Sequence, residues 1–199
     1  VIIGGSLHDG EDEAQLDAYA AARERIAHTA LVIVPRYPAD ADVVERRARE
    51  RGVAVGRKTA IDAGAAEARG RRGVLVVDTV GELSRMYAVA DLAFVGGSLF
   101  FRGANKGGHN LMEPAILGVP VLFGPYNFSF KETVEDLLAA DAGKLVRDAA
   151  ELRAVVVSLV ADRSARRALG SRARRVVEAG RGATARNYAL LAEFTRVRP

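Results

Sequence analysis

Glycine, hydroxyl and basic side chains follow several short apolar runs of the sequence. Ser6 and His8 follow the first run together with two glycines, and Arg36 stands between two prolines after the second. Glycine lets a backbone approach a ligand closely, and a guanidinium can bind a phosphate or carboxylate through two parallel hydrogen bonds. These residue types predict a site for an anion. Two alternatives stay open: Arg36 is an ordinary surface residue, and His8 caps the following helix.

The segment 107–114, with the sequence GGHNLMEP, gives the sharpest signal. Gly107 and Gly108 precede a predicted helix, and the free N–H groups at a helix start bind phosphate. In the alternative, Asn110 only caps the helix and Glu113 completes a capping box. Pro114 argues against this, because it would then occupy the fourth helical position and remove the first intrahelical hydrogen bond. We therefore favour a binding site in which the Glu113 carboxylate accepts hydrogen bonds from a pair of ligand hydroxyl groups.

A third glycine-rich segment contains Gly97 and Ser98 and precedes a long loop over residues 99–106. The Ser98 hydroxyl either contacts the ligand or simply ends a strand. Phe100 and Phe101 in the loop either shield a base or an acceptor, or pack on another domain. His109 is expected beside the same cleft as Ser6 and His8.

Several kinds of site are excluded or disfavoured. The sequence contains no cysteine, which excludes thiol catalysis and zinc–thiolate sites, and only three histidines, so we expect no metal site and no cofactor. G-x-G-x-x-G, G-x-x-x-x-G-K-[ST], H-E-x-x-H and G-x-S-x-G are all missing. No run of 18 apolar residues occurs.

Short, continuous apolar runs alternate with segments of helical periodicity, and this pattern favours a parallel sheet covered on both faces. The predicted strands are 1–4, 30–34, 53–55, 73–77, 92–96, 119–123 and 144–146. The predicted helices are 11–27, 41–51, 82–90, 112–117, 130–140, 149–160, 164–179 and 183–194, and residues 58–72 are expected to form a loop or a short irregular helix. Two helix starts carry the capping-box pattern, Thr79 with Glu82 and Ser129 with Glu132. The predicted fold is α/β: a doubly wound, mostly parallel, Rossmann-like sheet with extra C-terminal helices.

The 199 residues are expected to form one ligand-binding domain. The first residues, Val1 to Ile3, already resemble a strand, which predicts that the chain is a fragment of a longer protein. The net charge is +4, but residues 144–199 hold 13 Lys and Arg against 5 Asp and Glu. This basic section is interpreted either as a solvated helix face or as a surface for phosphates or an anionic membrane. No nucleic-acid partner is expected.

Seven segments together resemble the C-terminal GT-B domain of bacterial 3-deoxy-D-manno-octulosonic acid (Kdo) transferases, over nearly the whole chain. They are GSLH at 5–8, PRYP at 35–38, VDTVGEL at 77–83, FVGGS at 94–98, GGHNLMEP at 107–114, GVPVLFGP at 118–125 and FSFKE at 128–132. Leu7, Tyr37 and the long loop at 99–106 depart from the usual family pattern.

The resemblance implies the donor-binding half of a glycosyltransferase that moves Kdo from CMP-Kdo to a lipid A precursor in lipopolysaccharide core biosynthesis. It implies that the enzyme acts in the cytoplasm, at the inner face of the inner membrane of a Gram-negative bacterium. The catalytic base and the acceptor site are expected in a missing N-terminal domain, so this part alone is expected to be inactive. The donor-binding residues implied are Arg36, Gly97, Ser98, Gly107, Gly108, Asn110 and Glu113.

Two other functions stay open at this point. One is a GT-B domain for a different nucleotide sugar, as in a UDP-sugar transferase or an epimerase. The other is a non-catalytic module that docks on a membrane or a partner through the basic C-terminal helices.

Overall fold

The structure is a computed structural model that describes residues 1–64, 73–180, 188 and 191. A single parallel sheet runs through its centre in the order β3-β4-β2-β1-β5-β6-β7. Its strands are β1 (Ile2–Leu7), β2 (Leu31–Pro35), β3 (Val55–Arg57), β4 (Val74–Val76), β5 (Leu92–Val95), β6 (Val121–Phe123) and β7 (Lys144–Leu145). The predicted parallel, doubly wound sheet is confirmed.

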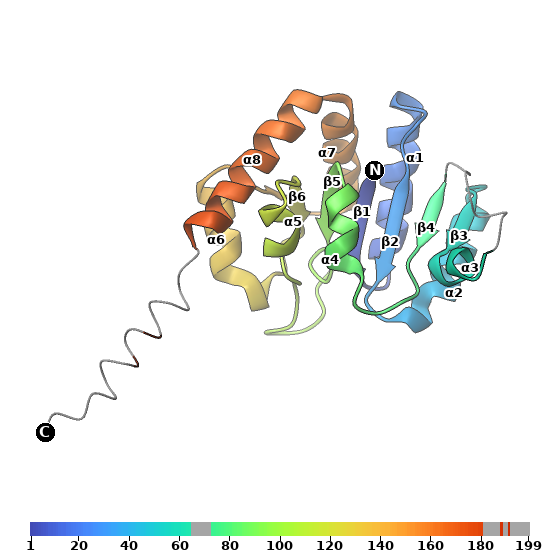
Figure 1. Ribbon diagram of the computed structural model, residues 1–199, viewed down its shortest axis with the longest axis horizontal. Coiled ribbons are helices and arrows are strands. Elements are labelled where there is room, and N and C mark those ends of the chain that lie inside the picture. Colours follow the sequence, from blue (N-terminus) through green and yellow to red (C-terminus); the bar gives the residue numbers. More distant parts are fainter. Residues whose placement is uncertain (65–72, 181–187, 189–190, 192–199) are drawn as a thin grey trace, which may run out of the picture.

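Helices cover both faces of this sheet (Figure 1). The α-helices are α1 (Glu11–Arg25), α2 (Ala41–Glu50), α3 (Lys58–Asp62), α4 (Leu83–Met86), α5 (Met112–Ile116), α6 (Lys131–Ala139), α7 (Ala149–Ala161) and α8 (Arg163–Ala179). Three short 3-10 helices complete the described elements: η1 (Pro38–Asp40), η3 (Tyr87–Val89) and η4 (Phe128–Phe130).

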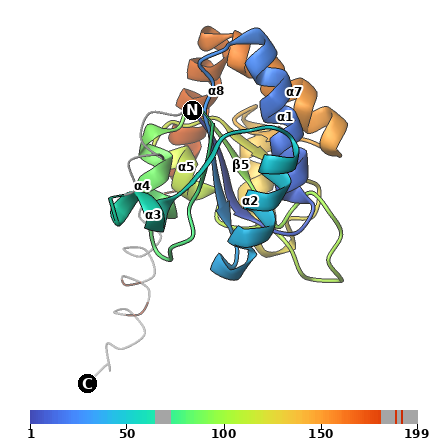
Figure 2. The same cartoon turned by 90° about the vertical axis from the view of Figure 1, so that its right-hand side faces the viewer.

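Strand residues alternate between the two faces of the sheet and so build separate cores. Ile2 in β1 and Phe94 in β5 pack with α1, α2 and α7, whereas Ile3 packs on the opposite face with Tyr87 of η3. The second of these faces also holds α5, α6 and the end of α8, whose core includes Phe123 and Leu137. Figure 2 shows α1, α2 and α7 on one side of the sheet and α3, α4 and α5 on the other. Burial on both faces explains why the strand sequences are continuously apolar rather than alternating.

Some predicted element boundaries are wrong. The strand predicted at 53–55 lies at Val55–Arg57, because the Val53 N–H still donates to Ala48 O at the end of α2 (3.1 Å). The helix predicted at 82–90 divides into α4 and η3. Residues 58–62 form α3, while 65–72 and the helix predicted at 183–194 fall largely outside the described residues.

The two predicted capping boxes are also wrong. The helix α4 begins after Glu82 and α6 begins after Phe130, and neither receives a side-chain capping hydrogen bond. The Thr79 hydroxyl donates to the Glu82 carboxylate instead. Side-chain caps occur at Asp148 and Asp162, which accept from the N–H groups of Glu151 and Ala165 at the starts of α7 and α8.

The direction in which the sheet grows changes between β1 and β5. From β1 the chain adds β2 on one side, and after β3 and β4 it returns to β5 on the other side. Loops from two neighbouring strands separate at such a point and leave a crevice at their carboxyl ends, where ligands of open α/β sheets bind. The loops that follow β1 and β5 carry most of the predicted site residues.

Candidate functional site

A cleft of about 460 Å³ opens at the carboxyl ends of β1 and β5. Its walls come from four segments: the end of β1, the start of η1, the loop between β5 and α5, and η4. The lining residues are His8, Tyr37, Gly97, Arg102, Asn105, Lys106, Gly107, Gly108, His109 and Ser129. The structure therefore brings together five of the predicted residues, His8, Gly97, Gly107, Gly108 and His109.

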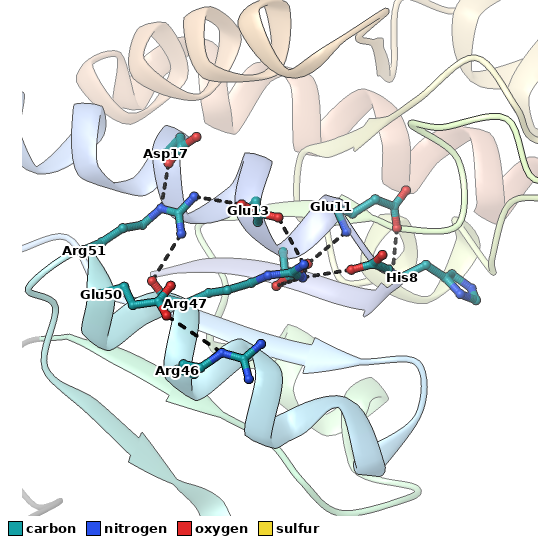
Figure 3. Close-up of polar contacts among 11 residues, drawn as sticks. His8, Glu11, Glu13, Asp17, Arg46, Arg47, Glu50 and Arg51 are labelled. Atoms are coloured by element: carbon teal, nitrogen blue, oxygen red, sulfur yellow. Dashed lines mark hydrogen bonds and ion pairs between the residues drawn. The ribbon is translucent and has the colours of Figure 1, made fainter.

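The two histidines meet inside this cleft. The Nε2 atoms of His8 and His109 are 3.0 Å apart, and the rings lie nearly parallel with an angle of 8° between their planes. Both residues line the same cleft, and their part in ligand binding stays a prediction. The His8 side chain does not cap α1: its backbone N–H donates to the Glu11 carboxylate (2.9 Å, Figure 3), and its ring contacts that of His109.

Burial and positive charge keep both imidazoles neutral at neutral pH. The pKa of His109 is lowered to about 4, mainly by burial and then by the neighbouring His8, Arg36 and Arg102, while Glu11 opposes them. Burial also lowers the pKa of His8, with Arg102 and Arg36 as the next causes and Asp40 acting against them. Burial is the larger cause for both rings, and the arginines that act in the same direction make the electrostatic potential in the cleft positive.

Three cations produce this potential. Arg102 and Lys106 line the cleft, and Arg36 lies close enough to act on both histidines. The Arg36 guanidinium lies over the Tyr37 ring, 5.4 Å from its centroid, and its backbone N–H fixes the loop by donating to Leu7 O (2.8 Å). Within residues 1–64 and 73–180, none of the three forms an ion pair with a carboxylate. Their charge is free to meet an anionic ligand.

Glycines allow the loops of the cleft to approach each other. A Cβ atom on Gly97, whose φ is 71°, would lie 2.9 Å from the His109 ring. Gly107 has a φ of 142°, and a Cβ there would lie 2.3 Å from Tyr126 O. The N–H of Gly108 donates to Gly97 O (2.7 Å), which joins the two ends of the long loop. Larger residues at these positions would push the cleft walls apart.

Glu11, which sequence reasoning missed, supports the floor of the cleft. Its side chain is buried at the start of α1 and accepts hydrogen bonds from the backbone N–H groups of His8, Gly97, Ser98 and Leu99, at 2.7–2.9 Å. It therefore ties the loop after β1 to the loop after β5. The only sequence signal is the acidic first turn 11–13, which is common to many helices.

Ser98 lies beneath the cleft rather than in its wall. Its hydroxyl donates to Val95 O (2.8 Å) and accepts from the N–H of Gly124 (2.9 Å), and the residue is fully buried. The structure thus favours the second alternative, that Ser98 ends the strand and supports the loop. Its assignment as a donor-binding residue stays a prediction.

Asn110 and Glu113 lie at the start of α5, next to the cleft. Asn110 Oδ1 accepts from the N–H of Met112 (3.0 Å), and its Nδ2 donates to Glu113 Oε1 (3.2 Å). The capping position itself is Leu111, so Pro114 occupies the third helical position, where no hydrogen bond is lost. This helix start agrees with the argument from Pro114 that Asn110 is not the capping residue. Because α5 has only five residues, its dipole adds little to anion binding.

Ser6 lies at an irregularity where β1 meets the cleft. Its φ is 54°, a left-handed conformation that is rare outside glycine, and the register of β1 against β2 shifts between Gly5 and Leu7. This bulge turns the chain toward His8. Strain of this kind is often found beside functional sites.

The aromatic residues of the long loop remain near the cleft mouth. Phe101 is exposed, with its ring centroid 5.5 Å from that of Tyr126, and Phe100 is half-exposed. Neither lines the cleft, so the two alternatives for these residues stay open.

A second group of charged residues joins α1 to α2 behind His8 (Figure 3). Arg47 contacts Asp9 and Asp12 (both 2.9 Å) and Glu13 (3.1 Å), and Arg51 contacts Glu13 (3.2 Å) and Asp17 (2.9 Å). We call these six residues the α1–α2 ion network. Burial alone would lower the pKa of Arg47, but its hydrogen bonds with Asp12 and Asp9 hold that pKa above its usual value.

Within residues 1–64 and 73–180, no three His, Asp or Glu side chains are grouped so as to hold a metal ion. No described helix is both long and apolar enough to cross a membrane.

A parallel sheet of this order, with a cationic cleft at its switch point, has the fold of a GT-B glycosyltransferase domain. The C-terminal domain of a group 1 family glycosyl transferase (LpcC) from Francisella tularensis superposes with a TM-score of 0.60, covering 89% of this chain and 84% of that one. At 13% identity this comparison shows the fold alone. No family model matches the sequence.

The proteins that match at higher sequence identity are Kdo transferases, a more specific class of glycosyltransferase. The chain is 34% identical over 197 residues to the 3-deoxy-D-manno-octulosonic acid transferase of Bordetella pertussis, covering 98% of this chain and 44% of that protein. It is 33% identical over 151 residues to that of Aquifex aeolicus, covering 76% and 39%. The C-terminal CMP-Kdo binding domain of WaaA from Acinetobacter baumannii is 27% identical with a TM-score of 0.76, and 88% of each chain is covered. The chain is thus homologous to the Kdo transferases and spans less than half the length of these two curated relatives.

Proposed function

We propose that this chain is the donor-binding half of a glycosyltransferase and that its cleft binds CMP-Kdo. The observation that carries this proposal is the superposition with the CMP-Kdo binding domain, which covers 88% of both chains. The charge of the cleft supports it, since a nucleotide sugar that carries a phosphodiester and a carboxylate suits a site with three unpaired cations.

The residues divide this task by position. Arg102 and Lys106 from the cleft wall, with Arg36 beside it, meet the negative charges of the donor. The backbone at Gly97, Gly107 and Gly108 lies close to the phosphate, where a side chain would block it. Asn110 and Glu113 bind hydroxyl groups of the ribose or of Kdo from the start of α5.

The remaining steps of the reaction belong to parts of the enzyme outside this chain. We propose that a separate N-terminal domain holds the lipid A precursor and the base that removes a proton from the acceptor hydroxyl. That oxygen then forms a bond to the anomeric carbon of Kdo as the bond to the CMP phosphate breaks. The chain on its own binds the donor and transfers nothing.

A titration of the chain with CMP, UDP, GMP and AMP by calorimetry tests the proposal. CMP is expected to bind most tightly, and Arg36→Ala and Glu113→Ala are each expected to weaken it about tenfold, the loss of one charged hydrogen bond. Arg46→Ala is the matched control, because Arg46 is an exposed arginine paired with Glu50 on α2, away from the cleft. A preference for UDP would keep the fold and assign another sugar donor. Unchanged affinity in both cleft variants would refute the site.

A membrane-docking role for the basic C-terminal section is a second candidate. Arg163, Arg166 and Arg167 surround a depression of about 220 Å³ next to Gly118 and Pro120, which precede β6 at the amino end of the sheet. We propose that this face meets anionic lipid headgroups at the inner surface of the inner membrane while the cleft points elsewhere. Sedimentation with anionic vesicles, weakened by salt, supports this role. Equal sedimentation with neutral vesicles contradicts it.

A further inference from the structure

The paired histidines of the cleft have a contact that nucleotide binding alone does not require. His8 comes from the end of β1 and His109 from the loop before α5, and their Nε2 atoms are 3.0 Å apart. At that distance one nitrogen must donate and the other must accept, because two N–H groups or two lone pairs would repel. The pair therefore holds one proton between the two Nε2 atoms before a ligand binds.

Charged groups from each surrounding segment act on this pair. Arg102 and Lys106 belong to the loop after β5, Arg36 follows β2, Asp40 ends η1, and Glu11 begins α1. The carboxylate of Glu11 is already shared among four backbone N–H groups, so cations dominate. Burial, together with this balance of charges, keeps a further proton off the pair before a ligand binds.

We propose that the His8–His109 pair takes up one proton from solvent when an anionic phosphate group enters the cleft, so that the affinity for the phosphate ligand increases as the pH falls. The bound anion cancels the repulsion that Arg36 and Arg102 exert on an imidazolium. The added proton occupies an outer ring nitrogen, and the bond between the two Nε2 atoms is kept. The only bond formed is the N–H bond to the proton that solvent supplies, and no bond of the ligand changes. The inference rests on the proposed function only in taking a cytidine phosphate as the ligand.

The same two nitrogens do not make a convincing metal site. Arg102 and Lys106 line the cleft beside them and repel a divalent cation. The described part of the chain also groups no third metal-binding side chain with them. Proton uptake is the chemistry that fits both the contact and its surroundings.

Nitrogen-15 NMR of the imidazole rings tests the inference directly, because the chain has only three histidines. His28 lies in a separate pocket with Val1, Thr29 and Asp91 and serves as an internal control. The probe is the methyl ester of CMP, whose phosphodiester keeps a single charge between pH 5 and 9. Saturation with this probe is expected to raise the apparent pKa of the pair by at least about one unit and to leave His28 unchanged. An unchanged pKa for the pair overturns the inference.

Calorimetry with the same probe at pH 5 and pH 8 gives an independent result. The wild-type chain is expected to bind at least about twofold more tightly at pH 5 and to take up protons, which two buffers of different ionisation enthalpy reveal. His8→Gln and His109→Gln are expected to lose this dependence, whereas His28→Gln keeps it. Circular dichroism checks that each variant folds. Binding of equal strength at both pH values overturns this inference alone, and no binding at either overturns the proposed function with it.

Discussion

Two groups of cationic side chains adjoin His8, and they differ in what neutralises them. In the α1–α2 ion network, Arg47 and Arg51 each contact at least two carboxylates. In the cleft, Arg102 and Lys106 meet no carboxylate within residues 1–64 and 73–180. Glu11, the carboxylate that supports the floor of the cleft, is used by backbone N–H groups. Paired charges hold the helices together, and unpaired charges mark the place for an anion.

The largest effect is expected from removing the buried carboxylate that supports the cleft. Glu11→Ala leaves four backbone donors without their acceptor and is expected to cost about 3–5 kcal/mol of unfolding free energy. That corresponds to a fall of roughly 10 °C in melting temperature. Glu13→Ala, which removes an exposed member of the α1–α2 ion network, is expected to cost less than about 1 kcal/mol. Equal losses would show that the two regions do not differ in this way.

Gly97→Ala is expected to have the next largest effect. The added methyl group meets the His109 ring at 2.9 Å in a left-handed backbone conformation, so both packing and strain are lost. We expect about 2–3 kcal/mol of destabilisation and at least about tenfold weaker CMP binding. Gly81→Ala separates the two causes, because Gly81 has a φ of 86° but no atom within 4 Å of its Cβ position. It is expected to lose about 1 kcal/mol and no affinity.

Substituting one arginine from each of the two regions sharpens the comparison further. Arg102→Ala is expected to weaken CMP binding about tenfold, with little change in unfolding free energy, because an exposed cation is lost. Arg47→Ala is expected to have the opposite pattern, since it leaves the buried Asp12 unpaired. Urea unfolding and calorimetry on both variants measure the two quantities. A loss of affinity in Arg47→Ala equal to that in Arg102→Ala would contradict the division.

The smallest effect concerns stability in mild acid. The folded-state pKa of His109 is about 4, below its unfolded value near 6.5, so the unfolded chain binds more protons between these values. Its stabilising contribution is complete above pH 6.5 and is lost as the pH falls toward 4, by about 1 kcal/mol after allowance for solvent screening. Melting at pH 7.5 and pH 5 is expected to show a smaller drop in His109→Gln than in the wild-type chain. An identical drop in both would contradict the assignment.

The layered fold was predictable because its signal is local. Continuous apolar segments such as 31–35 and 92–95 identify strands buried on both faces without knowledge of their partners. The cleft loops were predictable for the same reason, since they follow those strands. Glu11 and Arg102 were not, because their roles depend on where distant loops meet. The role of Ser98 was left open because a sequence does not show which of two hydrogen-bond partners a hydroxyl will take.

The contacts of Glu11 also bear on when the cleft forms during folding. Its carboxylate joins backbone positions 86 to 88 residues further along the chain. Closing so long a loop costs conformational entropy, and this cost comes before the stabilisation that the hydrogen bonds provide. The central pairing of β1 with β5 must therefore be in place first, and contacts of such high sequence separation form slowly. The recovery of nucleotide binding during refolding would thus report when the central sheet is complete.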